Sequence, residues 1–246
     1  MTLSVAILAG GLAKRLKKKT ENIQKALIDI EGEPFISRQL THLSNQGIKK
    51  VLICIGHLGN QIENYVGDGS KFKLKVFYSK DGNSLLGTGG SAKKASKILE
   101  ENFFILYGDS FLPINFSNIQ KAFFNKKKPA LMTIIKNNNK WDKSNVFFKD
   151  NNLIYNKNNP KNNMNYIDYG LSVVNKSIFN LFPDNTKFDL SELFENLSNR
   201  DLLAGFEVYD RFYEIGSIKG IKDTINFFKK EYKSKWAIAI YTCQNQ

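Results

Sequence analysis

The stretch that decides the fold reads "VAILAGGLAKRLKKKTENIQKALIDI" and covers residues 5–30. A short apolar run that ends in glycines is typical of a buried parallel strand. Gly10 and Gly11 let backbone N–H groups approach an anion with no Cβ in the way. Arg15 and Lys25 follow as cations that can bind phosphate. The stretch is therefore open to two interpretations: a phosphate-binding loop, or a strand, a turn and a solvated basic patch.

Strand-like and helix-like patterns alternate outward from this stretch, with short connections, through about residue 136. This alternation predicts an α/β fold with a doubly wound, mostly parallel sheet. Such sheets bind ligands at the carboxyl ends of their strands. After the first strand, the expected strands are "KKVLICIG" (49–56), "LKVFYS" (74–79), "FFILYGDS" (103–110) and "PALMTIIK" (129–136).

The rest of the chain predicts a β-rich second lobe folded onto the first, within one domain of residues 1–246. Turn residues separate short apolar runs there, and a long amphipathic pattern closes the chain. The expected elements are a hairpin at 144–156, a strand at 166–175, a helix at 188–199 capped by Asp189 or Ser191, two strands within 202–217 that turn near Tyr209 and Asp210, and a terminal helix at 218–235.

The formal net charge is +13, which raises the alternative of a nucleic-acid binder. The lysines are spread along the whole chain rather than massed in one tract, so we expect no nucleic-acid partner. A general positive field would still draw in an anionic substrate. No apolar run reaches about 18 residues and the first residues lack a signal-peptide layout, so we expect a cytoplasmic protein with no membrane partner.

Two further segments carry candidate chemistry. "LLGTGGSAKKA" (85–95) places glycines before a helix, whose N-terminus favours anions, although a plain strand-to-helix connection has the same composition. Asp109 stands at the carboxyl end of an apolar strand. A carboxylate at that position is well placed to hold Mg²⁺, and it could instead cap a turn.

These segments resemble the signature of the sugar-phosphate nucleotidyltransferases. The pattern of that family is roughly L-A-G-G-x-G-T-R-L-x-x-x-T, then P-K-x-L, with L-G-T-[AG]-G and a strand ending in G-D further on. The chain keeps the arginine and the lysine of the pattern as Arg15 and Lys25. It departs from the pattern at Ala13, Lys14 and Gln24, where glycine, threonine and proline are usual. The resemblance implies a Rossmann-like nucleotidyltransferase fold.

The resemblance covers about residues 4–223 and implies a nucleotide-binding half (1–136) and an acceptor-binding lobe (137–246). Arg15 and Lys25 would be the catalytic cations, on the phosphates around the reacting centre. Asp109 would hold Mg²⁺ together with Glu214, whose segment "RFYEIGS" is similar to the family's [WFY]-x-D-[IT]-G-[ST]. Glu214 would otherwise be a surface residue before a helix start. The implied nucleotide-binding residues are Leu8, Ala9, Gly10, Gly11, Gly87, Thr88, Gly89 and Gly90, and the implied acceptor-binding residues are Lys157, Asp168 and Gly170.

The implied reaction is nucleotidyl transfer, with a nucleoside triphosphate and a sugar 1-phosphate as partners. The products are a nucleotide sugar for cell-surface glycan synthesis and pyrophosphate. The layout is most similar to bacterial heptose and mannose 1-phosphate guanylyltransferases, which use GTP. Two alternatives stay open: a nucleotide-binding or regulatory homologue with impaired catalysis, and a cytidylyl- or uridylyltransferase for a phosphate that is not a sugar phosphate. The oligomeric state is also open, a homo-oligomer included.

Overall fold

The computed structural model describes residues 2–11, 22–82 and 85–230 of the 246-residue chain. The described residues form a nine-stranded mixed sheet. Its main part runs, in spatial order, β5 (Lys75–Lys80), β4 (Lys50–Ile55), β1 (Ser4–Leu8), β6 (Asn102–Tyr107), β11 (Tyr166–Asn175), β8 (Ala130–Lys136) and β12 (Leu203–Val208). The first four strands are parallel to one another. β11 runs antiparallel to both β6 and β8, and β12 is parallel to β8.

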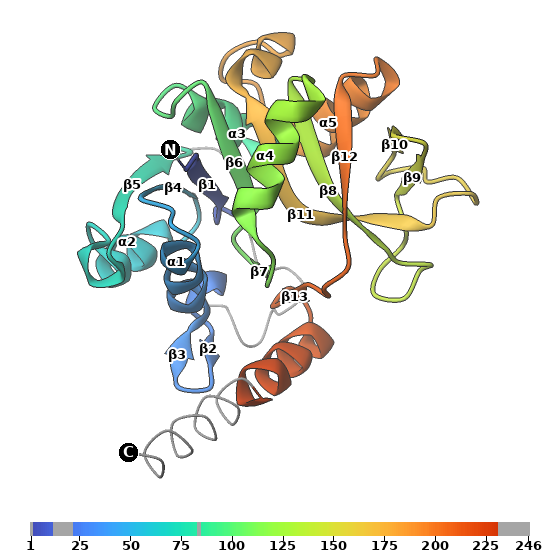
Figure 1. Ribbon diagram of the computed structural model, residues 1–246. Helices are drawn as coiled ribbons and strands as arrows, with labels where there is room; N and C mark the ends of the chain where they lie inside the picture. Colours follow the sequence, from blue (N-terminus) through green and yellow to red (C-terminus); the bar gives the residue numbers. More distant parts are fainter. Residues whose placement is uncertain (1, 12–21, 83–84, 231–246) are drawn as a thin grey trace, which may run out of the picture.

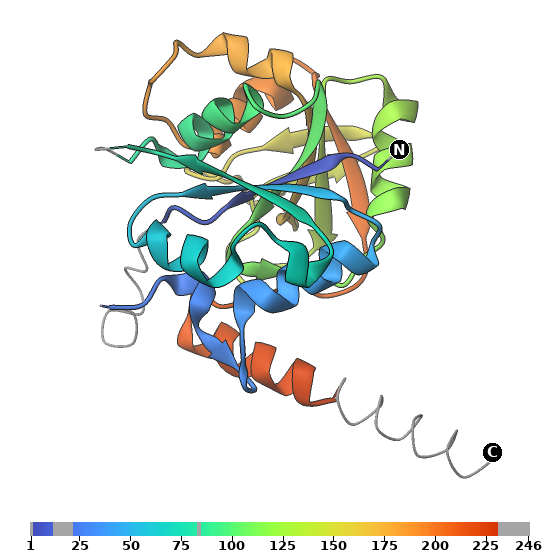
Figure 2. The ribbon, with the colours of Figure 1, turned by 90° about the vertical axis from the view of Figure 1, so that its left-hand side faces the viewer.

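Helices cover both faces of this sheet (Figure 2). Val5 and Ile7 of β1 point into one apolar layer, while Ala6 and Leu8 point into the other. Both sets are buried, as expected for a strand covered on two sides. The first layer holds α1 (Phe35–Asn45), α2 (Gly59–Val66) and α4 (Phe116–Lys126), and the second holds α3 (Gly87–Ser96) and α5 (Leu190–Asn199).

The predicted fold class is confirmed, and strands from both halves of the chain share the one sheet. The expected hairpin is present as β9 (Val146–Lys149) and β10 (Asn152–Tyr155), which joins the sheet beside β11. Asp189 caps α5, and Glu192 completes a capping box. The described residues also include the short 3₁₀ helices η2 (Lys25–Leu27), η3 (Ser70–Phe72) and η4 (Lys176–Leu181).

The two strands expected within residues 202–217 are present, and each pairs with a strand elsewhere in the chain rather than with the other. β12 pairs with β8, whereas β13 (Tyr213–Glu214) pairs antiparallel with β7 (Ser110–Phe111). The chain leaves the main sheet between them, where Tyr209 is 85% exposed. Each strand finds its partner in a distant part of the sequence, and the β7–β13 pair brings the chain back to the end of β6.

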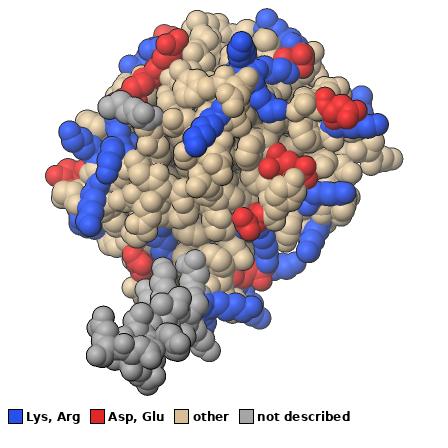
Figure 3. All heavy atoms as spheres, viewed as in Figure 1, with Lys and Arg blue, Asp and Glu red and all other residues tan. Residues whose placement is uncertain are grey.

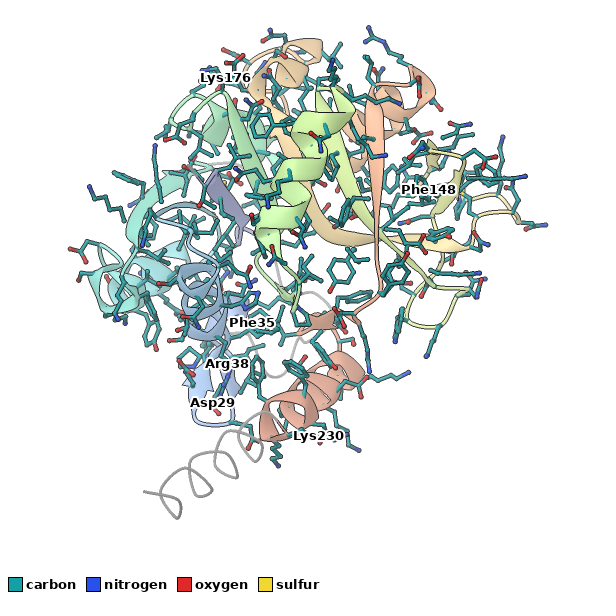
Figure 4. All side chains as sticks on the ribbon, in the orientation of Figure 1. Asp29, Phe35, Arg38, Phe148, Lys176 and Lys230 are labelled. Atoms are coloured by element: carbon teal, nitrogen blue, oxygen red, sulfur yellow. The ribbon has the colours of Figure 1, made fainter. Side chains whose placement is uncertain are left out.

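Residues 218–230 form the helical part of the chain's end that the structure describes. This helix lies below the sheet in Figure 1, beside the small hairpin of β2 (Asp29–Ile30) and β3 (Glu33–Pro34). Ile30 and Phe35 pack with Phe228 in a separate apolar cluster. The guanidinium carbon of Arg38 lies 4.3 Å from the centre of the Phe228 ring, and Figure 4 shows Arg38 next to Phe35. These contacts anchor the terminal helix.

Charged side chains are scattered over the face drawn in Figure 3, where acidic residues lie between the lysines and arginines. Several lysines are paired at the surface, such as Lys50 with Glu100 at 2.9 Å and Lys128 with Asp201 at 2.6 Å. Exposed pairs of this kind contribute little to stability. Over the described ranges, no helix has the length and apolar character needed to cross a bilayer.

Candidate active site

Three strand ends meet at one edge of the sheet and carry the polar residues of the candidate site. β1 leads into Gly10, β5 leads into Asp81, and β6 is followed by Asp109. A Cβ on Gly10 would lie 3.2 Å from the backbone nitrogen of Gly56 and 3.6 Å from Oδ2 of Asp81. Glycine therefore allows the loop after β1 to lie close against the ends of its neighbours.

Two cavities open at this edge, and their walls share Tyr107 and Asp109. The first cavity has a volume of about 290 Å³ and lies between the loop after β1, the turn around Lys25 and the start of α3. The second cavity has a volume of about 410 Å³ and lies between β11 and the segment from Arg211 to Asp223. Of the predicted nucleotide-binding residues, the first cavity is lined by Leu8, Ala9, Gly10, Gly11, Gly87 and Thr88.

Lys25 and Asp109 form an ion pair between the two cavities. Nζ of Lys25 lies 2.6 Å from Oδ2 of Asp109, and the two side chains are 19% and 36% exposed. Lys25 is the first residue of η2, a turn that begins at Gln24. Arg15, the other predicted catalytic cation, lies outside the described residues.

The β7–β13 pair places Glu214 beside this ion pair. Glu214 is opposite Ser110 in the ladder, and the backbone N–H of Ile215 donates to the carbonyl of Asp109 at 3.0 Å. The three side chains converge on Gly216, because a Cβ built there would lie 2.8 Å from Oε2 of Glu214, 3.1 Å from Nζ of Lys25 and 3.4 Å from Oδ2 of Asp109. The structure therefore brings together three residues that the sequence analysis selected from separate motifs.

The Glu214 carboxylate is turned back over the first turn of the terminal helix. It accepts hydrogen bonds from the backbone N–H groups of Gly216 and Ser217, and from the Ser217 hydroxyl at 2.5 Å. Gly220 leaves room for it, because a Cβ on Gly220 would overlap the carboxyl group. The extra methylene of glutamate is thus accommodated by the start of the helix.

The donor set fits a hard divalent cation. Mg²⁺ takes oxygen ligands and is commonly held by one or two carboxylates together with substrate phosphates. Asp109 and Glu214 supply two carboxylates at the junction of the cavities. Oδ2 of Asp109 and Oε1 of Glu214 each accept one hydrogen bond from Lys25 and the Ser217 hydroxyl, respectively, and keep capacity for a cation, whereas Oε2 of Glu214 already accepts two. Among the described residues, no group of three or more acidic, histidine or cysteine side chains forms a preassembled metal cage.

The glycines that open α3 have two different surroundings. Gly87 and Thr88 line the first cavity, whereas Gly89 and Gly90 are buried and do not line it. A Cβ on Gly89 would overlap the ring of Phe188, and one on Gly90 would lie 2.7 Å from the carbonyl oxygen of Thr186. The close approach of the segment before α5 therefore accounts for these two glycines.

Of the three predicted acceptor-binding residues, two line a cavity and one does not. Asp168 and Gly170 line the second cavity, at an irregularity in β11 where Gly170 has a φ of +100° and donates its N–H to Oδ1 of Asp168 at 2.9 Å. Lys157 lines neither cavity in the structure and lies 3.4 Å from Oδ1 of Asp189. The bulge aims the Asp168 carboxylate into the cavity.

Burial raises the pKa of Asp168 to about 6, and this rise is partly offset by the N–H of Gly170 and the charge of Lys157. Desolvation disfavours the charged form of a carboxyl group that has few partners. Burial also raises the pKa of the neighbouring Tyr107 well above its usual range, with Asp168 adding to the effect. A ligand that donates hydrogen bonds to Asp168 would stabilise its ionised form.

Several residues that line the cavities were not predicted from the sequence. Asp81 lines the first cavity, and its position directly after a strand was a usable signal, the same one that identified Asp109. Trp141 and Arg211 line the second cavity from irregular segments, where no periodic pattern marks them. The Arg211 guanidinium pairs with Asp223 at 2.6 Å and lies 5.8 Å from the Trp141 ring.

Comparison with known proteins identifies the family. Residues 4–146 match a family model described as "Nucleotidyl transferase", so the chain belongs to the nucleotidyl transferase family. The chain is 28% identical, over 86% of its length and 93% of the relative's, to D-glycero-alpha-D-manno-heptose 1-phosphate guanylyltransferase from Campylobacter jejuni. It is also 28% identical to a protein of the same name from Aneurinibacillus thermoaerophilus, over 78% of this chain and 83% of that one.

The fold of this chain is also similar to that of solved structures. The crystal structure of HddC from Yersinia pseudotuberculosis complexed with GMP-PN superposes with a TM-score of 0.76 and 22% identity, covering 92% of this chain and 100% of that one. The family, the enzyme class and the sugar-phosphate nucleotidyltransferase reaction expected from the sequence are thereby confirmed.

Proposed function

We propose that this enzyme transfers a guanylyl group from GTP to the phosphate of a sugar 1-phosphate, with release of pyrophosphate. The observation that carries the proposal is the meeting of Lys25, Asp109 and Glu214 at the junction of two cavities. The first cavity would take the nucleotide and the second the sugar phosphate. The reacting phosphates would then meet at the shared wall.

The roles follow from the charges at that junction. Lys25 would bind the α-phosphate or the acceptor phosphate, and Arg15 the rest of the triphosphate, while the loop from Leu8 to Gly11 would hold the triphosphate through its backbone. Asp109 and Glu214 would hold Mg²⁺, which when bound neutralises phosphate charge. Lys157 would approach the acceptor phosphate after leaving Asp189.

The reaction needs no general base from the protein. An oxygen of the acceptor phosphate is already anionic at neutral pH, since the second pKa of a phosphate ester is about 6. It forms a bond to the α-phosphorus as the bond to the β-phosphate oxygen breaks, and the electron pair leaves with pyrophosphate. The protein therefore acts by positioning two anions and stabilising the charge that develops.

Asp81 supports the choice of guanine. Its carboxylate lines the first cavity and is held by the Ser91 hydroxyl at 2.6 Å and the N–H of Leu86 at 3.2 Å. A carboxylate accepts hydrogen bonds, so it suits the adjacent N1–H and exocyclic amino group of guanine. Uracil and thymine offer a single N3–H between two carbonyls, and cytosine has an acceptor nitrogen beside its amino group. The names of the two relatives, both guanylyltransferases, point the same way.

A pyrophosphate-release screen tests the proposal. GTP, CTP, UTP and TTP are each combined with a set of sugar 1-phosphates and with phosphates that are not sugar phosphates, in the presence of Mg²⁺. We expect turnover with GTP and a sugar 1-phosphate, and a loss of the preference for GTP in Asp81→Asn but not in the exposed control Asp68→Asn. Turnover confined to CTP or UTP would overturn the guanine assignment. Release with no pair would favour a binding or regulatory homologue.

We propose that the reaction takes place in the cytoplasm, where nucleoside triphosphates and sugar phosphates are available as substrates. The product would be a nucleotide sugar, the activated donor that a glycosyl transfer reaction must consume. Glycan synthesis at the cell surface is the use that we propose for it.

A further inference from the structure

We infer that Gln24 is a positioning residue for nucleotidyl transfer: its side chain ties the end of β1 to the turn that carries Lys25. The inference rests on the proposed function, since it assumes that Lys25 acts on the reacting phosphates. Gln24 is one of the three positions where the chain departs from the first signature of the family pattern, which has proline there. It is also 3% exposed, which is unusual for glutamine.

The side-chain amide of Gln24 donates one hydrogen bond and accepts another. Its Nε2 donates to the carbonyl of Ala9 at 2.6 Å, and its Oε1 accepts from the N–H of Ala26 at 2.6 Å. The second bond caps η2, the 3₁₀ turn in which Lys25 is the first residue. The first bond reaches the residue that directly precedes Gly10 and Gly11 in the loop after β1.

Ala9 is held from two sides as a result. Its own N–H donates to the carbonyl of Cys54 in β4 at 2.9 Å, which continues the pairing of β1 beyond Leu8. Its carbonyl is engaged by Gln24. The start of the glycine loop therefore cannot shift relative to the sheet without breaking one of these bonds.

The backbone of Gln24 adds a third attachment. Its N–H donates to Oε1 of Gln61 in α2 at 2.8 Å, and Nε2 of Gln61 donates to the carbonyl of Asn22 at 2.9 Å. Gln24 has a φ of −63°, the value that a proline ring fixes. A proline could adopt this φ, but it could not make the hydrogen bonds of the Gln24 amide.

Lys25 gains its position from this arrangement. Both its neighbours are buried, with Ala26 2% exposed, so the backbone at Lys25 is fixed and its side chain extends to Asp109 at 2.6 Å. Catalysis by an electrostatic group depends on such placement, and a displacement of about 1 Å can cost about a hundredfold in rate. Removing the Gln24 amide would free both the turn and the loop.

A double-mutant cycle tests the inference by pyrophosphate release, with kcat and KM measured for GTP and a sugar 1-phosphate. We expect Gln24→Ala to lower kcat by about ten- to a hundredfold, with KM for the sugar phosphate within about twofold. Lys25→Ala should lower kcat by about a hundredfold. If Gln24 acts through Lys25, the double variant should be no slower than Lys25→Ala alone.

Two further variants separate positioning from stability. Gln24→Glu keeps the acceptor for the N–H of Ala26 but places a carboxylate oxygen against the carbonyl of Ala9, so it should lose rate like Gln24→Ala. Gln46→Ala is the matched control, because Oε1 of Gln46 accepts from the N–H of Phe116 at 3.2 Å, between α1 and α4. It should lower the melting temperature and leave kcat unchanged.

The outcomes are distinct. Additive losses in the double variant, or a Gln24→Ala enzyme that loses melting temperature but not kcat, would overturn the inference and leave the proposed function intact. Unchanged kinetics in Lys25→Ala would remove Lys25 from the proposed function and the inference with it. If Gln24→Ala fails to fold, the comparison of Gln24→Glu with Lys25→Ala, singly and combined, decides the question in the same way.

Discussion

The two cavities that meet at Asp109 are built in different ways. The first is assembled from the carboxyl ends of parallel strands and the glycines that follow them, so each wall is a short local motif. The second is assembled from a bulge in β11, the loop around Trp141 and the segment that joins β13 to the terminal helix. Its walls come from segments far apart in the sequence, which the β7–β13 pair and the ring contacts of Phe212 with Trp141 and Tyr169 bring together.

This difference suggests where each cavity is sensitive. Parallel strands with buried side chains hold the strand ends that line the first cavity, so changes at those ends should act mainly on chemistry. The second cavity depends on one short ladder, a bulge in β11 and one helix start, so single changes there should move its residues. Four substitutions test the contrast, taken from the largest expected effect to the smallest.

Asp109 is shared by both cavities, so its loss should be the most severe. We expect Asp109→Asn to lower kcat by about a thousandfold, because it removes the carboxylate that we propose to hold the metal and the partner of Lys25 together. Pyrophosphate release at saturating Mg²⁺ measures the loss, and a melting curve checks the fold. The exposed Asp201→Asn, which only breaks a surface pair with Lys128, is the control. Near-full activity of Asp109→Asn would remove Asp109 from the metal site.

Gly220 tests how the second cavity holds Glu214. Alanine in a helix is usually more stabilising than glycine by about 1 kcal/mol, but here its Cβ would overlap the Glu214 carboxyl group. We expect Gly220→Ala to raise the Mg²⁺ concentration for half-maximal rate by about tenfold or more, the scale of one misplaced electrostatic group. Binding of Mn²⁺ in the presence of GTP, measured by electron paramagnetic resonance, gives a readout that is independent of turnover.

Two further variants test whether the effect of Gly220→Ala comes from its overlap with Glu214. Lys222→Ala, at an exposed position of the same helix, should leave the metal requirement unchanged. The shorter side chain in Glu214→Asp should relieve the overlap with the carboxyl group and leave the contact with the Glu214 carbonyl oxygen at 2.6 Å, so Gly220→Ala should cost less in that background than in the unmodified enzyme. Equal costs in both backgrounds would contradict the placement of Glu214.

Gly89 tests the packing behind the first cavity rather than its chemistry. A Cβ there would overlap the Phe188 ring, and overpacking of this kind typically costs about 1–3 kcal/mol. We expect Gly89→Ala to lower the melting temperature by about 2–10 °C with a smaller change in KM for GTP. A loss of GTP affinity at an unchanged melting temperature would instead place Gly89 in contact with the nucleotide.

Asp168 should show the smallest effect, and one that depends on pH. Its folded pKa of about 6 lies above the ordinary value of 3.8, so ionisation opposes folding. The cost of ionising Asp168 is fully present at pH 7 and above, where it lowers the unfolding free energy. This cost disappears as the pH falls through 6 toward 4. Because the residue is only partly buried, we expect Asp168→Asn to raise the unfolding free energy at pH 7 by about 1–2 kcal/mol.

Melting curves from pH 4 to 7.5 measure this difference. The gap between Asp168→Asn and the unmodified enzyme should be largest near neutral pH and should close at about pH 4. Added sugar 1-phosphate should narrow the gap near neutral pH, since its hydroxyl groups would donate to the ionised carboxylate. A gap that is constant with pH would show that the Asp168 carboxyl group does not titrate as described.

Much of the fold and of the first cavity could be predicted from the sequence. The alternation of buried strands and helices determines a doubly wound sheet, and the sheet determines that Gly10 and Asp109 lie at the same edge. These features depend on residues close together in the chain, where the period of the apolar residues and the turn chemistry are visible. Asp81 obeyed the same rule and could have been found by it.

The rest was decided by tertiary structure. The pairing of β13 with β7 depends on register between distant segments, which no local pattern encodes, and it is this pairing that sets Glu214 beside Asp109. Gly89 and Gly90 have the composition of a ligand loop, yet their surroundings are set by the segment before α5. Gln24 looked like a departure from a family pattern until its amide was seen to join Ala9 to Ala26. A sequence determines where a strand ends, whereas the partners of a buried polar or glycine residue are determined only when the remote segments have packed.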